Sequence, residues 1–218
     1  MPKKKIKVIL IDMDGTLYPI QEESFLLSPV HNEIQRRSIE FISKSLNINP
    51  EKSRKIFIEI KKDYPKLYSV GLKERYGINR KKYLDYSWNI NPRDFVKLPK
   101  GIKNLLSELC KKYSLYLVSD APEVWINNLL RNFDIENLFT GKFSGTDLNR
   151  EKKEGLFIHV LKTLNLSPNN VIMIGDEKDT DMIPAKNSGI STIFLGSEKE
   201  FKADYNIRSI FDLKNILL

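Results

Sequence analysis

The sequence predicts an α/β fold in which helices flank a parallel β-sheet and a small α-helical bundle is inserted after the first strand. Short aliphatic runs, such as residues 6–11 and 171–174, alternate with amphipathic stretches along much of the 218-residue chain. These runs are almost free of polar residues, which is typical of parallel strands buried on both faces. Between residues 18 and 97 the alternation stops, and only helical periodicity remains.

The expected domain boundaries follow this change in periodicity. Residues 1–18 and 98–218 form the predicted α/β core domain, and residues 19–97 the predicted helical domain. In the helical domain, a capping side chain followed by proline marks two helix starts. Four helices are expected there, beginning after Ser28 and after Asn49 and spanning residues 67–76 and 79–88.

In the core domain, strands and helices alternate. Strands are expected where aliphatic residues run together, at residues 6–11, 115–118, 139–143, 171–174 and 192–195. Helices are expected where apolar residues recur every three to four positions, at residues 102–113, 123–131, 152–164 and 181–188. Residues from Tyr205 onward indicate one more edge strand or a closing helix. Alternating elements with short links favour a parallel sheet with right-handed crossovers.

The composition narrows the class of protein and its partners. A hydrophobic content of 41% with 29% charged residues is typical of a soluble globular protein. The net charge of +8 comes from scattered lysines, whereas nucleic-acid binders concentrate their basic residues, so nucleic acid is not an expected partner. No stretch could span a bilayer, so no membrane partner is expected. Cys110 is the only cysteine, which is consistent with the cytoplasm, and its helical pattern predicts a small core residue.

Polar residues stand where several predicted strands end. Asp12 and Asp14 follow the first strand, Ser119 the second, and Asp176 a later one, with Asp181 shortly after it. Ligands bind at the carboxyl ends of strands in such sheets. Clustered carboxylates repel one another unless a cation lies between them, and hard oxygen ligands favour Mg²⁺. Phosphoryl transfer also needs hydroxyl, amide and cationic donors. The pattern therefore predicts a site for Mg²⁺ and a phosphoryl group.

Two motifs resemble those of the haloacid dehalogenase superfamily. Residues 12–16 match its first motif, Asp-x-Asp-Gly-Thr, and residues 175–181 resemble its fourth, Gly-Asp followed by another Asp in the next turn. The resemblance implies a Rossmann-like core with a helical cap. It also implies an enzyme, a Mg²⁺-dependent phosphatase that hydrolyses a small phosphorylated metabolite through an aspartyl-phosphate.

The resemblance also implies roles for individual residues. Asp12 matches the nucleophile, and Asp14 matches the general acid that protonates the leaving oxygen. Ser119 matches the phosphate-binding serine or threonine of the second motif. Asp176 would bind Mg²⁺ directly and Asp181 would hold its waters or second shell, so the metal site implied is Asp12, Asp14, Asp176 and Asp181.

The third motif departs from the family pattern. The usual lysine position falls on Glu151, with Lys152 and Lys153 beside it and no proline. Some phosphatases of the superfamily carry this lysine inside the first helical turn, a spacing that selects Lys153 over Lys152. A solvated surface lysine is the alternative for either residue.

Other functions stay open at this point. A sugar-phosphate mutase of the same superfamily would use the same aspartates. Residues 16–19 resemble those of pyrimidine 5′-nucleotidase-like members, which is a weak indication of substrate. A non-enzymatic relative that binds a phosphorylated ligand or a protein is the alternative from a different class. A dehalogenase is disfavoured because those relatives lack the second aspartate, and Asp14 is present.

Overall fold

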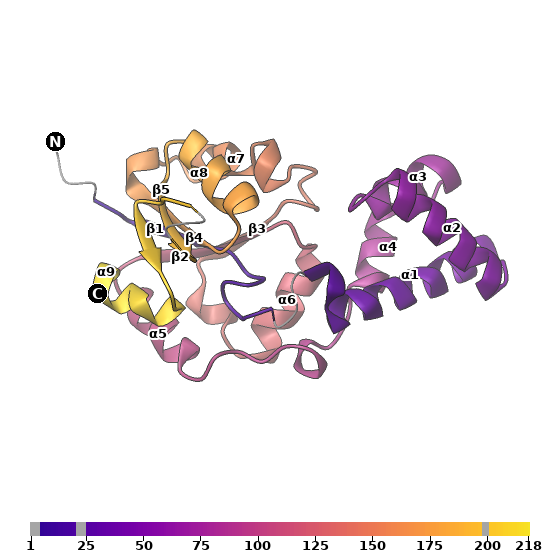
Figure 1. The fold of residues 1–218 in the computed structure, drawn as a ribbon, viewed down its shortest axis with the longest axis horizontal. Helices are drawn as coiled ribbons and strands as arrows, with labels where there is room; N and C mark the ends of the chain where they lie inside the picture. The colour runs from indigo at the N-terminus through magenta and orange to yellow at the C-terminus, as the bar shows by residue number, and fades with distance from the viewer. Residues whose placement is uncertain (1–4, 21–24, 198–200) are drawn as a thin grey trace. The chain divides into compact units, whose positions relative to one another are not determined.

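The chain divides into two compact units. The computed structural model describes residues 5–20, 25–197 and 201–218. Figure 1 shows a sheet with its flanking helices in one unit and only helices in the other. The units are Met1–Ile20 with Val96–Leu218, and Gln21–Phe95. Among the described residues, no helix combines the length and the apolar composition that a membrane span requires.

The predicted α/β fold class is confirmed. The described strands form one sheet in the order β3-β2-β1-β4-β5-β6, and every neighbouring pair is parallel. β1 is central and fully buried, as its unbroken aliphatic sequence predicts. The strands are β1 (Val8–Ile11), β2 (Ser114–Ser119), β3 (Gly141–Ser144), β4 (Val171–Gly175), β5 (Ser191–Leu195) and β6 (Tyr205–Ile207).

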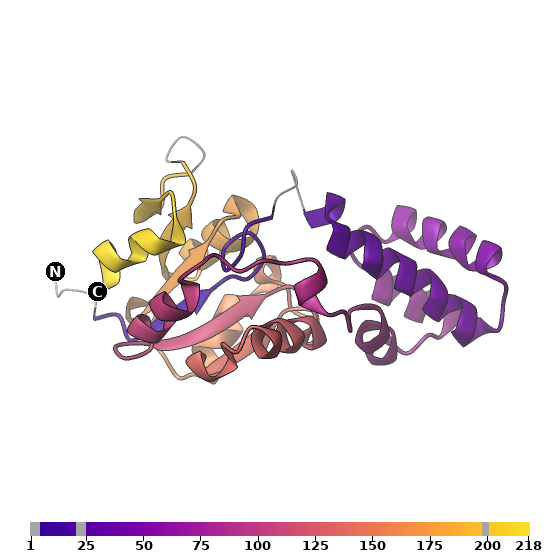
Figure 2. The same ribbon diagram turned by 90° about the horizontal axis from the view of Figure 1, so that it is seen from below.

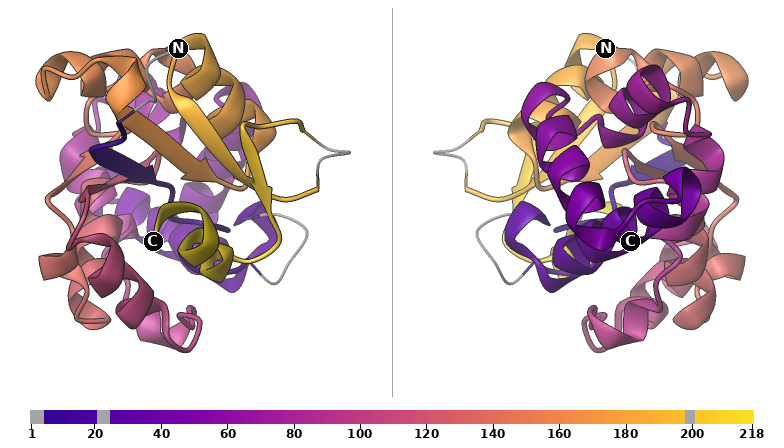
Figure 3. Two further views of the ribbon diagram at one scale, coloured as in Figure 1. Left: turned by 90° about the vertical axis from the view of Figure 1, so that its left-hand side faces the viewer. Right: turned by 90° about the vertical axis from the view of Figure 1, so that its right-hand side faces the viewer.

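Helices cover both faces of this sheet. Val8 and Leu10 share a buried apolar cluster with residues of α7 and α8, which lie on one face. Because side chains alternate along a strand, Ile9 and Ile11 point to the opposite face, where Figures 2 and 3 show α5 and α6. These helices and the closing one are α5 (Ile102–Leu109), α6 (Glu123–Asn132), α7 (Leu156–Thr163), α8 (Ile183–Asn187) and α9 (Leu213–Leu217).

Three details of this unit differ from the expectations. The helix expected from residue 152 begins at Leu156, because Gly155, with φ 93°, separates it from a short 3₁₀ turn. The chain after Tyr205 forms both a strand and a helix, where only one was expected. Cys110 is exposed rather than a core residue, because α5 ends at Leu109, one position before it.

In the second unit, the described residues 25–95 form four α-helices around an apolar core. Its helices are α1 (Pro29–Leu46), α2 (Pro50–Asp63), α3 (Tyr68–Tyr76) and α4 (Arg80–Ser87). The Ser28 hydroxyl and the Asn49 and Asn79 amides each accept a backbone N–H in the first turn of α1, α2 and α4. Each such cap contributes about 1 kcal/mol. Phe57, Ile60 and Tyr83 are among the residues that fill the core between the helices.

Candidate active site

The turn after β1 brings the first motif against β4. Ile11 pairs with Ile174, and the backbone N–H of Asp12 donates to the Ile174 carbonyl oxygen at 2.9 Å. The turn then folds back on itself, because Gly15 N–H donates to the carbonyl oxygen of Tyr18 at 2.9 Å. Gly15 has φ 87°, and a Cβ there would lie 2.0 Å from Oδ2 of Asp176. Only glycine therefore allows the two motifs to approach this closely.

Three aspartates meet at this edge of the sheet. Asp12, Asp176 and Asp181 each place a carboxylate oxygen within 4.8 Å of the others. Asp12 and Asp181 are buried, with exposed fractions of 4% and 0%. The Thr16 hydroxyl donates to Asp176 at 2.9 Å, and Glu177 N–H donates to Asp181 at 3.0 Å. Backbone and hydroxyl donors thus hold the carboxylates in a fixed arrangement.

The charges of these carboxylates are poorly compensated within the protein. Burial raises the pKa of Asp12 to about 7; Lys152 opposes this rise, and Asp176 and Asp14 add to it. Burial and Asp12 raise the pKa of Asp181 to about 7, and burial and Asp181 raise that of Asp176 to about 6. A divalent cation bound to carboxylate oxygens would relieve this repulsion, so the residues present fit Mg²⁺.

The lysine of the site is Lys152. Its ammonium group is buried and donates to the Asp12 carboxylate and, at 2.5 Å, to that of Asp181. Burial disfavours its charge, but Asp12, Asp181 and Asp120 together hold the pKa of Lys152 above the usual value for lysine. The lysine therefore stays positively charged beside the two carboxylates.

Lys153, which the sequence analysis selected, does not occupy this position. Its side chain is exposed, whereas that of Lys152 is buried. The expectation placed the lysine inside the first turn of an α-helix, but Lys152–Glu154 is a 3₁₀ turn that ends before Gly155. Lys152 N–H also donates to the Asp120 carboxylate at 2.9 Å, which fixes its backbone. The different turn geometry directs Lys152, and not its neighbour, to the aspartates.

Ser119 lies at the same edge of the sheet. It is the last residue of β2 and is 2% exposed. Because Ile11 pairs with Leu117, the ends of β1 and β2 coincide to within a few residues. Its hydroxyl accepts the backbone N–H of Ala121 at 3.0 Å, which orders the loop that leads into α6.

The Asp14 side chain is not one of the three clustered carboxylates. Among the described residues, the three-aspartate cluster leaves out its side chain, in contrast to the metal-binding role that the resemblance implied. The physical reason is that the Asp14 carboxylate accepts a hydrogen bond from the Tyr18 hydroxyl, which holds it beside Tyr18. Burial raises the pKa of Asp14, while Tyr18, Lys152 and the indole of Trp125 oppose the rise. A carboxyl group with a raised pKa suits a proton donor.

Thr16 and Tyr18 are two further residues of the site, beyond those that the sequence predicts. Thr16 belongs to a recognisable motif, but its bond to Asp176 depends on a residue 160 positions away. The turn signal Asp-Gly-Thr could have pointed to the backbone pairing of Asp14 with Tyr18. Trp125, in α6, is fully buried.

Comparison with known proteins gives similarity along most of the chain. A family model described as haloacid dehalogenase-like hydrolase matches residues 9–195. The phosphoglycolate phosphatase of Vibrio cholerae is 25% identical over 85% of this chain and 82% of that protein. The glyceraldehyde 3-phosphate phosphatase of Methanocaldococcus jannaschii is 27% identical over 97% of each chain. The crystal structure of a HAD phosphatase from Thermococcus onnurineus has a TM-score of 0.67 at 21% identity, covering 97% of this chain and 98% of that one.

Proposed function

The chain belongs to the haloacid dehalogenase-like hydrolases, and we propose that it is a Mg²⁺-dependent phosphatase that hydrolyses small phosphorylated metabolites. One observation carries this proposal. Three carboxylates within 4.8 Å of one another and the Lys152 ammonium group meet at the carboxyl edge of the sheet. This combination of a metal-binding donor set and a fixed cation suits the charge of a phosphoryl group.

In the proposed reaction, Asp12 is the nucleophile. Its carboxylate oxygen attacks phosphorus, the bond from phosphorus to the ester oxygen breaks, and an aspartyl-phosphate forms. The departing oxygen takes the proton of Asp14 and leaves as an alcohol. A water molecule then attacks phosphorus and gives its proton to Asp14. The bond from phosphorus to the Asp12 oxygen breaks, so that inorganic phosphate and the free Asp12 carboxylate are formed.

The remaining residues bind and orient the phosphoryl group. Lys152 offers an ammonium group beside Asp12, and Ser119 offers a hydroxyl group from the end of β2. Asp12, Asp176 and Asp181 are the residues that would hold Mg²⁺, which neutralises the carboxylates and attracts phosphoryl oxygens when it is bound. Thr16 keeps the Asp176 carboxylate in position for this role.

Substrate selection is proposed to reside in the helical unit, Gln21–Phe95. The polar groups around Asp12 are sufficient for a phosphoryl group and a cation, which every phosphate ester shares. The rest of the substrate must then meet other groups. Both similar phosphatases are named for small phosphate esters, and the net charge of +8 favours anionic substrates. A small anionic phosphate ester is therefore the proposed substrate class.

The proposal is tested by phosphate release from p-nitrophenyl phosphate and from a panel of metabolite phosphates, with Mg²⁺ and with excess chelator. Release that requires Mg²⁺ and is absent in Asp12→Asn is the expected result. Full activity in chelator, or an active Asp12→Asn variant, contradicts the proposal. Conversion of a sugar phosphate to its isomer without phosphate release would indicate a mutase instead.

A further inference from the structure

The hydroxyl group of Tyr18 is held in one place by the chain around it. Tyr18 is 4% exposed, its carbonyl oxygen accepts the Gly15 N–H at 2.9 Å, and its backbone bridges to that of Asp14. The hydroxyl donates to Oδ1 of Asp14. Because one short turn carries both residues, the Asp14 carboxyl group is fixed by a partner only four positions away. Its second oxygen, Oδ2, is not used by this bond.

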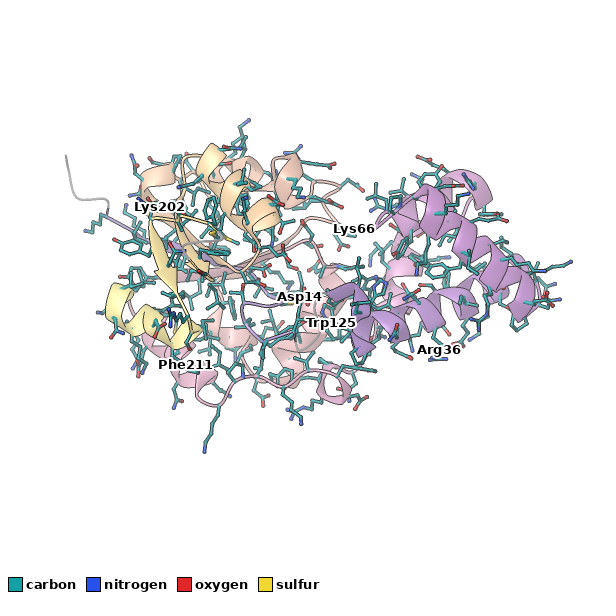
Figure 4. All side chains as sticks on the ribbon, in the orientation of Figure 1. Asp14, Arg36, Lys66, Trp125, Lys202 and Phe211 are labelled. Atoms are coloured by element: carbon teal, nitrogen blue, oxygen red, sulfur yellow. The ribbon has the colours of Figure 1, made fainter. Side chains whose placement is uncertain are left out.

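A second donor beside this pair makes no well-formed hydrogen bond. The indole Nε1 of Trp125 is fully buried and close to Asp14, but among the described residues it makes no hydrogen bond of good geometry. The indole lies next to Asp14 and Tyr18, and Figure 4 labels Asp14 and Trp125 side by side. Unpaired buried donors are rare in folded proteins, so each one requires an explanation. A group that gains negative charge during the reaction is such an explanation.

We propose that Tyr18 is the positioning residue of the general acid, and that Trp125 supplies a donor to Asp14 once its proton has left. This inference rests on the proposed phosphatase function. The Tyr18 hydroxyl holds Oδ1, so that the proton on Oδ2 faces the departing ester oxygen. When that proton transfers and the bond from phosphorus to the ester oxygen breaks, Asp14 becomes a carboxylate. The Tyr18 O–H and the Trp125 N–H then stabilise a charge that was absent before transfer.

The competing explanation is purely structural. The Tyr18 hydroxyl would then only satisfy a buried carboxyl group, and its loss would lower the activity on every substrate by a similar factor. A positioning role instead makes the loss depend on the leaving group. An ester whose leaving group needs no proton is insensitive to the acid, whereas a more basic leaving group depends on it. The two explanations therefore differ in a measurable ratio.

The experiment compares Tyr18→Phe with wild type on two aryl esters of similar shape, p-nitrophenyl phosphate and phenyl phosphate, at saturating Mg²⁺. We expect kcat for phenyl phosphate to fall about 10–100-fold and kcat for the nitrophenyl ester by less than about 3-fold. Trp125→Phe should show the same selectivity with a smaller loss. Tyr113→Phe is the matched control, since it removes a tyrosine hydroxyl that donates to the Leu217 carbonyl oxygen elsewhere in the same unit.

A double variant tests whether Tyr18 acts through Asp14. In an Asp14→Asn background, Tyr18→Phe should cause no further selective loss, because the acid is already absent. Equal losses on both esters, or full additivity in the double variant, would overturn the inference. If Tyr18→Phe does not fold, the same ratio measured for Trp125→Phe decides the question. Failure of wild type to hydrolyse either ester with Mg²⁺ would instead overturn the proposed function itself.

Discussion

Replacing Lys152 by methionine removes one charge and keeps most of the side-chain volume. The ammonium group contacts the buried carboxylates of Asp12 and Asp181, so its loss leaves two buried acids without their cation. Breaking a buried ion pair from one side destabilises a protein by about 3–5 kcal/mol. For a chain of this length, that corresponds to a fall of roughly 6–20 °C in the melting temperature.

The assay is thermal unfolding at pH 8 in chelator, with Lys153→Met as the matched control. Lys153 is exposed, and its substitution should change stability by no more than about 0.5 kcal/mol. At pH 5.5 the penalty of Lys152→Met should shrink, because Asp12 and Asp181, with pKa values near 7, are then mostly protonated. Equal melting temperatures for the two variants at pH 8 would refute the assignment of Lys152 to the site.

Four further outcomes are expected. Metal-free protein should melt at a lower temperature as the pH rises from 5 to 8, because carboxyl groups with raised folded-state pKa values bind more protons in the native state than in the unfolded state. Mg²⁺ should raise the melting temperature more at pH 8 than at pH 5, since the ligands must be deprotonated; an equal rise would count against the carboxylate site. Gly15→Ala should weaken Mg²⁺ binding at least about tenfold in calorimetry, because its Cβ would displace Asp176; unchanged affinity would contradict this. Replacing residues 21–95 by a short linker should preserve aryl phosphatase activity and flatten preferences across a metabolite panel, and an unchanged ranking of substrates would place selectivity elsewhere.

The fold and the three aspartates were predictable because they depend on local sequence. The aliphatic run of residues 8–11 is typical of a buried strand, and in a parallel sheet the residues that follow such strands reach one edge. Asp12, Asp176 and Asp181 therefore meet there without any knowledge of tertiary contacts. The end of β2 brings Ser119 to the same edge by the same rule.

The lysine was not predictable from the same reasoning. Lys152 and Lys153 are chemically identical and adjacent, so their roles depend on the backbone angles of one turn. Gly155, with φ 93°, and the hydrogen bond from Lys152 N–H to Asp120 set those angles. The Asp120 partner lies 32 positions away in the chain, beyond the reach of any local pattern.

The Tyr18–Asp14 bond shows a second limit. The separation of four positions in the sequence places Asp14 and Tyr18 near each other, but it does not determine which group the Asp14 carboxylate contacts. That depends on the fold of the turn, through the bond from Gly15 N–H to the Tyr18 carbonyl oxygen. In the helical unit, the burial of His31 depends in the same way on tertiary packing, since its side chain is 5% exposed and packs against Phe25 and Tyr68.

The central place of β1 in the sheet affects how the chain is assembled during synthesis. Val8 pairs with Ser114 on one side and with Val171 on the other, so the first strand leaves the ribosome long before either partner exists. Non-local pairing of this kind makes folding slow. The helical unit is one continuous segment, Gln21–Phe95, so its apolar core can form before β2 and β4 are synthesised. We therefore expect the helical unit to fold before the core unit during translation, and the site to form only after β4 has been synthesised.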